Sequence, residues 1–328
     1  MNLQILLQNF ADANNIIAGV CHPGPLDTTR LLQSEFTPFV SADILKRVSP
    51  ALSLKSVKSI IAIGVPYKKL ESLKPDYSLT TNTHTGNLSS LGTNEDYHVL
   101  VKDALIKLKA QLPATTKTKI LVDSGGLDER GFAHRAGLGF FGKNGLLISK
   151  KFGSLFNIGL MLTDIMLEED SYQSLVETSC PAKCNLCIEA CPTNALTLQG
   201  LNVKNCISYL TQKENLSQEE EELLKATSNQ LYGCDICQNI CLLNKKVALP
   251  LFTDSSETPE PKVTAGKCNS IFLTDKAQTN FSIDLNKWLN MDTEDFNKTY
   301  KNTAMLWKGT DILKRNGKLI SSNNNKPC

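Results

Sequence analysis

The feature that most constrains the fold is the crowding of cysteines in one part of the chain. Four of them lie in the short segment Cys180–Cys191, three more lie in Cys234–Cys241, and Cys206 stands between the two segments. The whole chain has 11 cysteines, so most of them fall in this stretch. Thiols in a reducing compartment stay unpaired, and closely spaced unpaired thiols are typical of metal sites. The sequence therefore predicts a segment that wraps around metal.

The spacing of these cysteines favours iron–sulfur clusters. The last three cysteines of the first segment and the three of the second share the spacing C-x2-C-x3-C, and Pro192 directly follows Cys191. In two-cluster ferredoxins, a cysteine at that last position binds the other cluster, and each 4Fe–4S cluster needs four thiolates. The predicted ligands are, for one cluster, Cys180, Cys184, Cys187 and Cys241 and, for the other, Cys191, Cys206, Cys234 and Cys237.

Two features depart from the ferredoxin pattern. Cys180 and Cys184 are spaced C-x3-C where ferredoxins have C-x2-C, which requires one extra residue to bulge near Pro181. Cys241 is followed by Leu242 instead of Pro, but Pro shapes the turn and binds no iron. Two structural zinc sites would also need eight thiolates, so zinc stays an alternative, and disulfide pairing is a weaker one. The cysteines without a partner at useful spacing, predicted to be free thiols, are Cys21, Cys268 and Cys328.

Composition limits the class of protein. The 328 residues leave room for two domains, and 41% hydrophobic with 21% charged residues is ordinary for a globular chain. The net charge of +2 gives no global sign of nucleic-acid binding. Asp12 interrupts the apolar start of the chain, which lacks a basic leader, so residues 1–20 predict an amphipathic helix and not a signal peptide. No apolar run approaches the roughly 18 residues of a membrane span, and we expect a cytoplasmic protein.

The chain before the cysteine segments alternates strand and helix patterns. A β-branched apolar run over 60–65 predicts a buried strand, and apolar residues at helical spacing over 95–112 predict a helix. Further strands are predicted over 120–122 and within 144–149 and 156–167. This alternation favours an α/β architecture.

Three regions follow from these patterns. Residues 1–172 are predicted to form the α/β domain, residues 173–250 a ferredoxin-like domain with both clusters, and residues 251–328 a linker and a short helical C-terminal region. Between the two cysteine segments, Ser217 is a candidate N-cap of an acidic helix.

The glycine-rich segment, residues 122–149, reads "VDSGGLDERGFAHRAGLGFFGKNGLLIS". Its residues 137–142 formally match the G-x-G-x-x-G dinucleotide fingerprint, which should follow a strand and open a helix. Here the order is reversed, because a helical pattern over 128–136 precedes the glycines and a strand pattern over 145–149 follows them. The glycines instead indicate a backbone that passes close to something large and flat.

Taken together, the glycine-rich segment, "FGS", "CNLCIEACPTNAL", "CISYLT" and "YGCDICQNIC" resemble the epoxyqueuosine reductase family, in order, from about Ile60 to Lys246. The resemblance implies a cobalamin-binding α/β domain, a ferredoxin-like domain and a helical C-terminal region. It implies an oxidoreductase that reduces epoxyqueuosine to queuosine in the anticodon loop of tRNA, using cob(I)alamin fed by two 4Fe–4S clusters. The partners implied are that tRNA and an external electron donor of the flavodoxin or ferredoxin type.

The resemblance also implies roles for individual residues. Asp123 matches the acid proposed to donate a proton over the cobalt face. A carboxyl group buried beside a corrin has a raised pKa and can act as a general acid. From the local sequence alone, the Asp-Ser-Gly-Gly turn favours a turn-capping role for Asp123, whereas His98 and His134 are equally well ordinary histidines. The cofactor-binding residues that the resemblance implies are Arg47, Tyr97, His98, Asp123, Lys143, Asn144, Ser154 and Ser208.

Three other functions stay open on the sequence. Cobalamin-dependent reductive dehalogenases share the clusters and the cofactor, but they usually carry a twin-arginine export signal, which this sequence lacks. A pure electron-transfer protein would bind no cobalamin. A nucleic-acid-binding module with structural clusters would bind RNA without turning over an epoxide.

Overall fold

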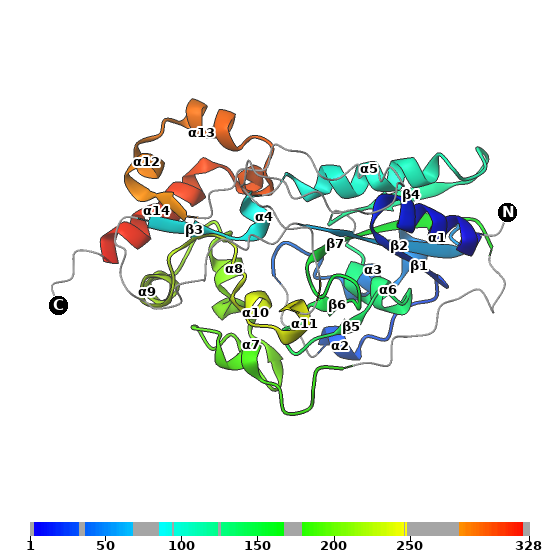
Figure 1. Ribbon diagram of the computed structural model, residues 1–328, viewed down its shortest axis with the longest axis horizontal. Helices are drawn as coiled ribbons and strands as arrows, with labels where there is room; N and C mark the ends of the chain where they lie inside the picture. The colour runs from blue at the N-terminus through cyan, green and yellow to red at the C-terminus, as the bar shows by residue number, and fades with distance from the viewer. Residues whose placement is uncertain are drawn as a thin grey trace, which may run out of the picture.

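The computed structural model describes residues 3–32, 37–67, 85–93, 95–123, 126–166, 179–245, 247 and 282–323 (Figure 1). Cys268 and Cys328, and nearly all of the predicted linker, lie outside these residues. Within them, no helix is long and apolar enough to cross a membrane.

A four-stranded sheet forms the centre of the N-terminal part. Its strand order is β1 (Ile17–Cys21), β2 (Ser59–Pro66), β7 (Phe156–Thr163) and β4 (Thr118–Leu121). Each neighbouring pair is antiparallel. The central strand β2 is buried over nearly its whole length, as its unbroken apolar run predicts. The predicted strands over 60–65, 120–122 and 156–167 correspond to β2, β4 and β7, whereas residues 17–20, predicted to belong to the first helix, form β1. The order of predicted elements gave no indication of the antiparallel pairing.

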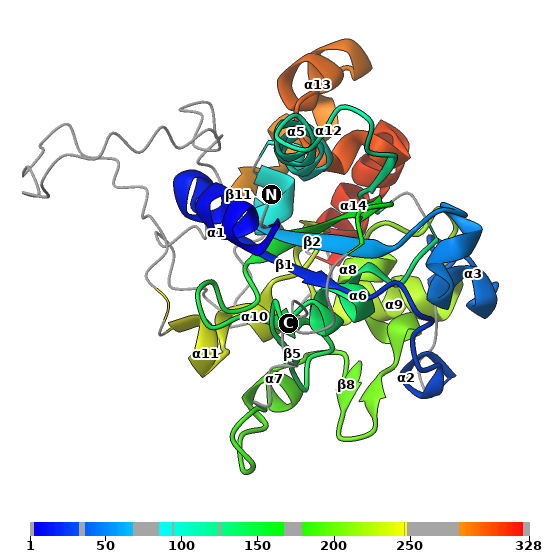
Figure 2. The same cartoon turned by 90° about the vertical axis from the view of Figure 1, so that its right-hand side faces the viewer.

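Helices cover both faces of this sheet (Figures 1 and 2). On one face, α1 (Leu3–Asn14) and α5 (Tyr97–Lys109) pack on Ile61 and Ile63 of β2. On the other, α6 (Glu129–Arg135) packs on Ile60 and Ala62. Successive residues of a strand point to opposite faces, so one apolar run supplies both cores. Short helices along the connection from β1 to β2 are α2 (Thr29–Leu32), α3 (Ile44–Val48) and η1 (Pro50–Leu52).

The glycine-rich segment folds into a hairpin after α6. Strand β5 (Phe140–Phe141) pairs antiparallel with β6 (Leu147–Ile148). A side chain at Gly139 would bring its Cβ within 2.3 Å of the Ile148 carbonyl oxygen, so only glycine fits there. The order of helix, glycines and strand is the one that the sequence predicts, and it differs from a dinucleotide-binding turn.

The cysteine segments lie on short elements below the sheets in Figure 1. The first precedes the β8–β9 hairpin, and the acidic helix α9 begins after Ser217, whose hydroxyl accepts the Glu220 N–H while the Glu220 carboxylate accepts the Ser217 N–H. This capping box confirms the predicted N-cap. The elements of this part are α7 (Leu186–Glu189), β8 (Leu196–Thr197), β9 (Gly200–Leu201), η3 (Val203–Asn205), α8 (Ile207–Leu210), α9 (Gln218–Thr227), α10 (Ile236–Asn239) and α11 (Leu242–Lys245).

A second sheet joins distant parts of the chain. Strand β3 (Thr85–Leu88) lies between β10 (Gln230–Tyr232), which is parallel to it, and β11 (Ser282–Asp284), which is antiparallel. Each strand comes from a different predicted region, so backbone pairing crosses both predicted boundaries, which themselves stay a prediction. Helices near this sheet are α4 (Ser90–Thr93), α12 (Leu285–Asn290), α13 (Thr293–Tyr300), η4 (Ala304–Lys308) and α14 (Thr310–Asn323).

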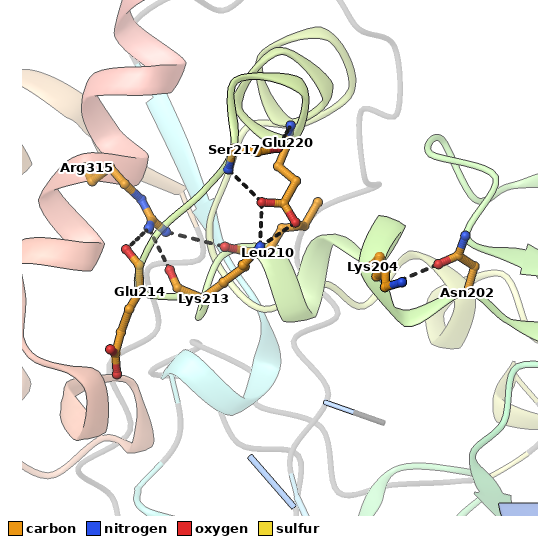
Figure 3. A network of polar contacts seen from close by, with 8 residues as sticks. All are labelled: Asn202, Lys204, Leu210, Lys213, Glu214, Ser217, Glu220 and Arg315. Carbon is orange, nitrogen blue, oxygen red and sulfur yellow. Dashed lines mark hydrogen bonds and ion pairs between the residues drawn. The ribbon is translucent and has the colours of Figure 1, made fainter. Parts of the chain in front are cut away.

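The C-terminal helix α14 is fixed to the cysteine-bearing part by Arg315 (Figure 3). Its guanidinium donates to the carbonyl oxygens of Lys213 at 2.6 Å and Glu214 at 2.8 Å. Lys213 in turn pairs with Glu220 of the capping box at 2.6 Å. The loop between α8 and α9 is thereby held against α14.

Candidate functional site

The cysteine thiols lie in two groups. The pKa of Cys187 is raised by burial and, among the neighbouring cysteines, by Cys180, Cys241 and Cys184. These are the four predicted ligands of one cluster. Among the described residues, no set of three or more Cys, His, Asp or Glu side chains is arranged to hold a single metal ion.

The four predicted ligands of the other cluster, Cys191, Cys206, Cys234 and Cys237, also lie close to one another. Burial raises the pKa of Cys234 to about 12, and the thiols of Cys206 and Cys191 lie close enough to add to the shift. Burial also raises the pKa of Cys237, with further contributions from Cys234, Cys206 and, across the two groups, Cys187. The two groups therefore approach one another at Cys237 and Cys187. A thiol that coordinates a metal is deprotonated outright. Burial favours the protonated thiols, so metal binding would have the opposite effect on their protonation.

Lys143 lies against the first cysteine loop. Its ammonium group donates to the carbonyl oxygens of Ala182 at 3.1 Å and Cys184 at 2.9 Å and to Asn185 Oδ1 at 3.0 Å. Its backbone N–H donates to Cys180 Sγ at 3.4 Å. The side chain predicted to line the cofactor is thus committed to the cysteine loop.

Asp123 lies at the end of β4 and is exposed, where burial beside a cofactor was expected. Its φ of +48° places it in the left-handed region, which Asp tolerates better than most residues. The Tyr97 hydroxyl, at the start of α5, donates a hydrogen bond to the Asp123 carboxylate.

The start of α5 brings two more titratable groups beside Tyr97. Asp96 caps the helix by accepting the His98 N–H at 3.0 Å, and its carboxylate lies 2.7 Å from His98 Nδ1. That hydrogen bond raises the pKa of His98. The rings of Tyr97 and His98 stack with centroids 4.1 Å apart. Burial, followed by the charge of Asp123, raises the pKa of Tyr97, so its hydroxyl remains a donor.

Glu129 is a site residue that the sequence did not single out. It is buried in the first turn of α6, and burial together with the charge of Asp123 raises its pKa to about 8. Its carboxyl group accepts the Asp123 backbone N–H. An acid in the first turn of a helix is commonly a solvated partner of the helix dipole, so only the tertiary structure reveals this contact.

Ser154 belongs to a buried polar network and not to an open pocket. Its hydroxyl donates to Gln238 Oε1 at 3.0 Å and accepts from Asn244 Nδ2 at 2.9 Å. The Tyr67 hydroxyl donates to the same Gln238 oxygen at 2.9 Å. Gln238 directly follows Cys237, so the network couples the sheet domain to the second cysteine segment.

The remaining predicted residues are placed as follows. Arg47 is buried in α3, where its carbonyl oxygen accepts the Asp128 N–H at 2.8 Å. Asn144 is buried, and its Nδ2 has no hydrogen-bond partner among the described residues. Ser208 is half-buried in α8, two residues after Cys206. His134 Nδ1 lies 2.7 Å from the Gly139 carbonyl oxygen, so this histidine supports the hairpin.

Comparison with known proteins gives two family matches. Residues 47–124 match the family described as epoxyqueuosine reductase QueG, DUF1730. Residues 180–244 match the family described as 4Fe-4S double cluster binding domain.

Individual relatives cover most of the chain. Epoxyqueuosine reductase of Lactococcus garvieae (strain Lg2) is 32% identical over 283 residues, which make up 85% of this chain and 72% of the relative. The enzyme of the same name from Staphylococcus aureus is 32% identical over 293 residues, with 88% and 70% covered.

Solved structures resemble this one closely. The structure of epoxyqueuosine reductase from Streptococcus thermophilus superposes with a TM-score of 0.77 at 29% identity, covering 98% of this chain and 82% of the other. A crystal structure of epoxyqueuosine reductase with an epoxyqueuosine-modified tRNA-Tyr stem loop has a TM-score of 0.80 at 28% identity, with 98% and 81% covered.

Proposed function

The chain belongs to the epoxyqueuosine reductase family, and we infer that it is an oxidoreductase that reduces epoxyqueuosine to queuosine in tRNA. The observation that carries this inference is the extent of the likeness: relatives of that name match 85% or more of the chain at 32% identity. The predicted resemblance is confirmed by these matches.

The reaction fixes what the site must supply. Both C–O bonds of the epoxide break, a C=C bond forms, and the oxygen leaves as water. The balance requires two electrons and two protons for each substrate. The chain must therefore provide a route for electrons, at least one acid, and a pocket for the modified base.

We propose that the electrons pass through two 4Fe–4S clusters held by the eight cysteines of the two groups. The match to a double-cluster domain supports the clusters, and the grouping of thiols supports the ligand assignment. An external donor of the flavodoxin or ferredoxin type and a cytoplasmic location stay predictions.

We further propose that cobalamin binds beside Asp123. The buried Asn144 Nδ2, which lacks a partner among the described residues, fits the amide-rich rim of a corrin. When bound, cobalamin supplies a nucleophilic metal centre for the reduction. Lys143 and Ser154 have polar atoms engaged by the cysteine segments. The residues proposed to line the cofactor remain those that the resemblance implies, Arg47, Tyr97, His98, Asp123, Lys143, Asn144, Ser154 and Ser208.

In this proposal, Asp123 protonates the oxygen that leaves the substrate. The Tyr97 hydroxyl at the start of α5 donates to the Asp123 carboxylate. The Glu129 carboxyl group in α6 accepts the Asp123 backbone N–H. Burial and the charge of Asp123 raise the pKa of Glu129, which favours the protonated form of its carboxyl group. The site thus places a second carboxyl group, able to hold a proton, beside the proposed donor Asp123.

The test of this function combines metal analysis with turnover. Anaerobically reconstituted protein is expected to hold about eight irons per chain, the content of two 4Fe–4S clusters. With cobalamin and a reductant, it is expected to convert epoxyqueuosine in a tRNA stem loop to queuosine, followed by mass spectrometry of the nucleosides. Two zinc ions without iron, or iron-loaded protein with cobalamin bound and no conversion, would each contradict the proposal.

Binding of the RNA is expected to weaken with salt. Loops of RNA are read by phosphate contacts and by bases splayed into pockets, and a net charge of +2 leaves few such contacts. About three phosphate contacts would cost roughly 20-fold in affinity between 50 and 200 mM salt. Fluorescence anisotropy with a labelled anticodon stem loop measures this change. Affinity that stays constant would favour a small-molecule substrate, as in a reductive dehalogenase.

A further inference from the structure

Lys143 stands out because every donor of its side chain is used on one loop. A lysine ammonium group has three N–H donors, and Lys143 has three acceptors, all between Ala182 and Asn185. The side chain is half-buried. Its charge is therefore fixed in place, and the loop that it binds connects two predicted ligands, Cys180 and Cys184.

The backbone of the same residue contacts a ligand atom. The Lys143 N–H donates to Cys180 Sγ at 3.4 Å. Lys143 comes from the tip of the β5–β6 hairpin in the sheet domain, so this contact reaches the cysteine segment from outside it. A charge and an N–H···S hydrogen bond thus converge on one group of thiols.

We propose that Lys143 sets the reduction potential of the cluster held by Cys180, Cys184, Cys187 and Cys241. This inference rests on the proposed clusters. Net charge, hydrogen bonds to sulfur and solvent exposure determine the potential of a cluster. One-electron reduction adds a negative charge to the cluster, and a fixed ammonium group nearby stabilises that charge. Lys143 therefore raises the potential and favours arrival of the electron at this cluster.

The second cluster provides an internal reference. The hydrogen bonds of Lys143 described above all end on the first cysteine loop. A substitution of Lys143 is therefore expected to shift the reduction potential of one cluster and to leave the potential of the other cluster in the same molecule unchanged. A general loss of stability would disturb both clusters.

The experiment is a redox titration followed by EPR on reconstituted Lys143→Met, with Lys143→Arg as the variant that keeps the charge. We expect Lys143→Met to lower the equilibrium constant for reduction of one cluster about tenfold, which corresponds to a decrease of about 59 mV in the potential of a one-electron couple. Lys143→Arg is expected to keep most of the wild-type value. Lys150→Met is the matched control, because Lys150 is exposed just beyond β6, and no shift is expected.

Three outcomes decide the matter. Wild-type protein with fewer than eight irons after reconstitution would overturn the cluster assignment itself. Lys143→Met with full iron and two unchanged potentials would overturn the role of Lys143. If Lys143→Met loses iron, Lys143→Gln replaces it, since an amide still donates to the loop carbonyls but carries no charge. An unchanged potential in iron-loaded Lys143→Gln then overturns the proposal, and a lowered one supports it.

Discussion

Asp123→Asn is expected to slow conversion of epoxyqueuosine-containing RNA by about 100- to 10,000-fold, the usual cost of losing a general acid. Asn has nearly the same shape and accepts the Tyr97 hydroxyl, but it has no proton to give. The fold, both clusters and cobalamin binding are expected to persist. The measurement is a single turnover by pre-reduced enzyme, because this excludes electron delivery from the observed rate.

Asp164→Asn is the matched control for this experiment. Asp164 directly follows β7, and its carboxylate accepts the Lys117 N–H at 2.9 Å, beyond the end of the β4–β7 pairing. The side-chain oxygen of Asn can accept the same hydrogen bond, so no loss of turnover is expected. Should Asp123→Asn behave like this control, Asp123 would be only a turn residue, and His98 would become the next candidate acid.

Cys206→Ala is expected to remove or convert one cluster and to leave the other. Cys206 lies far in sequence from both C-x2-C pairs, but the fold brings it close to Cys191 and Cys234. Loss of the cluster would halve the iron content from about eight to about four per chain. Iron analysis and EPR of the anaerobically reconstituted variant measure this directly.

Cys21→Ala is the control for metal content. Cys21 is buried in β1 against α6, where its thiol donates to the Phe132 carbonyl oxygen, and it is far from either predicted ligand set in the chain. We expect this variant to keep all its iron. If Cys206→Ala also keeps all its iron and full activity, another residue is the eighth ligand, and Cys268 would be tested next.

The sequence predicted those elements whose conformation is determined by residues close together in the chain. The apolar run of β2 and the capping box at Ser217 depend on residues close together in the chain. By contrast, β3 reads "TGNL" and has no strand signal of its own. Its conformation comes from pairing with β10 and β11, which are distant in sequence.

The candidate site shows the same division. The spacing predicted that Cys184 lies with Cys187 and Cys234 with Cys237, because each C-x2-C pair converges locally, whereas the position of Cys206 beside Cys191 and Cys234 comes from the fold. The contacts of Lys143 depend on the cysteine loop that the fold places beside it. The burial of Glu129 and its contact with Asp123 depend on the end of β4, which the fold places beside α6. Side chains of this kind look like ordinary solvated charges in the sequence. They acquire a role only from tertiary neighbours.

The position of β3 in the second sheet also imposes an order of events during synthesis. At about 5–20 residues per second, the strand Ser282–Asp284 leaves the ribosome about 2–8 s after Cys241. During that interval all eight predicted ligands have been made, while the outer edge of β3 still lacks its last partner. An unpaired edge strand is a template for aggregation. For these few seconds the nascent chain therefore carries all eight predicted ligands while this edge of β3 is still open to pairing with another chain.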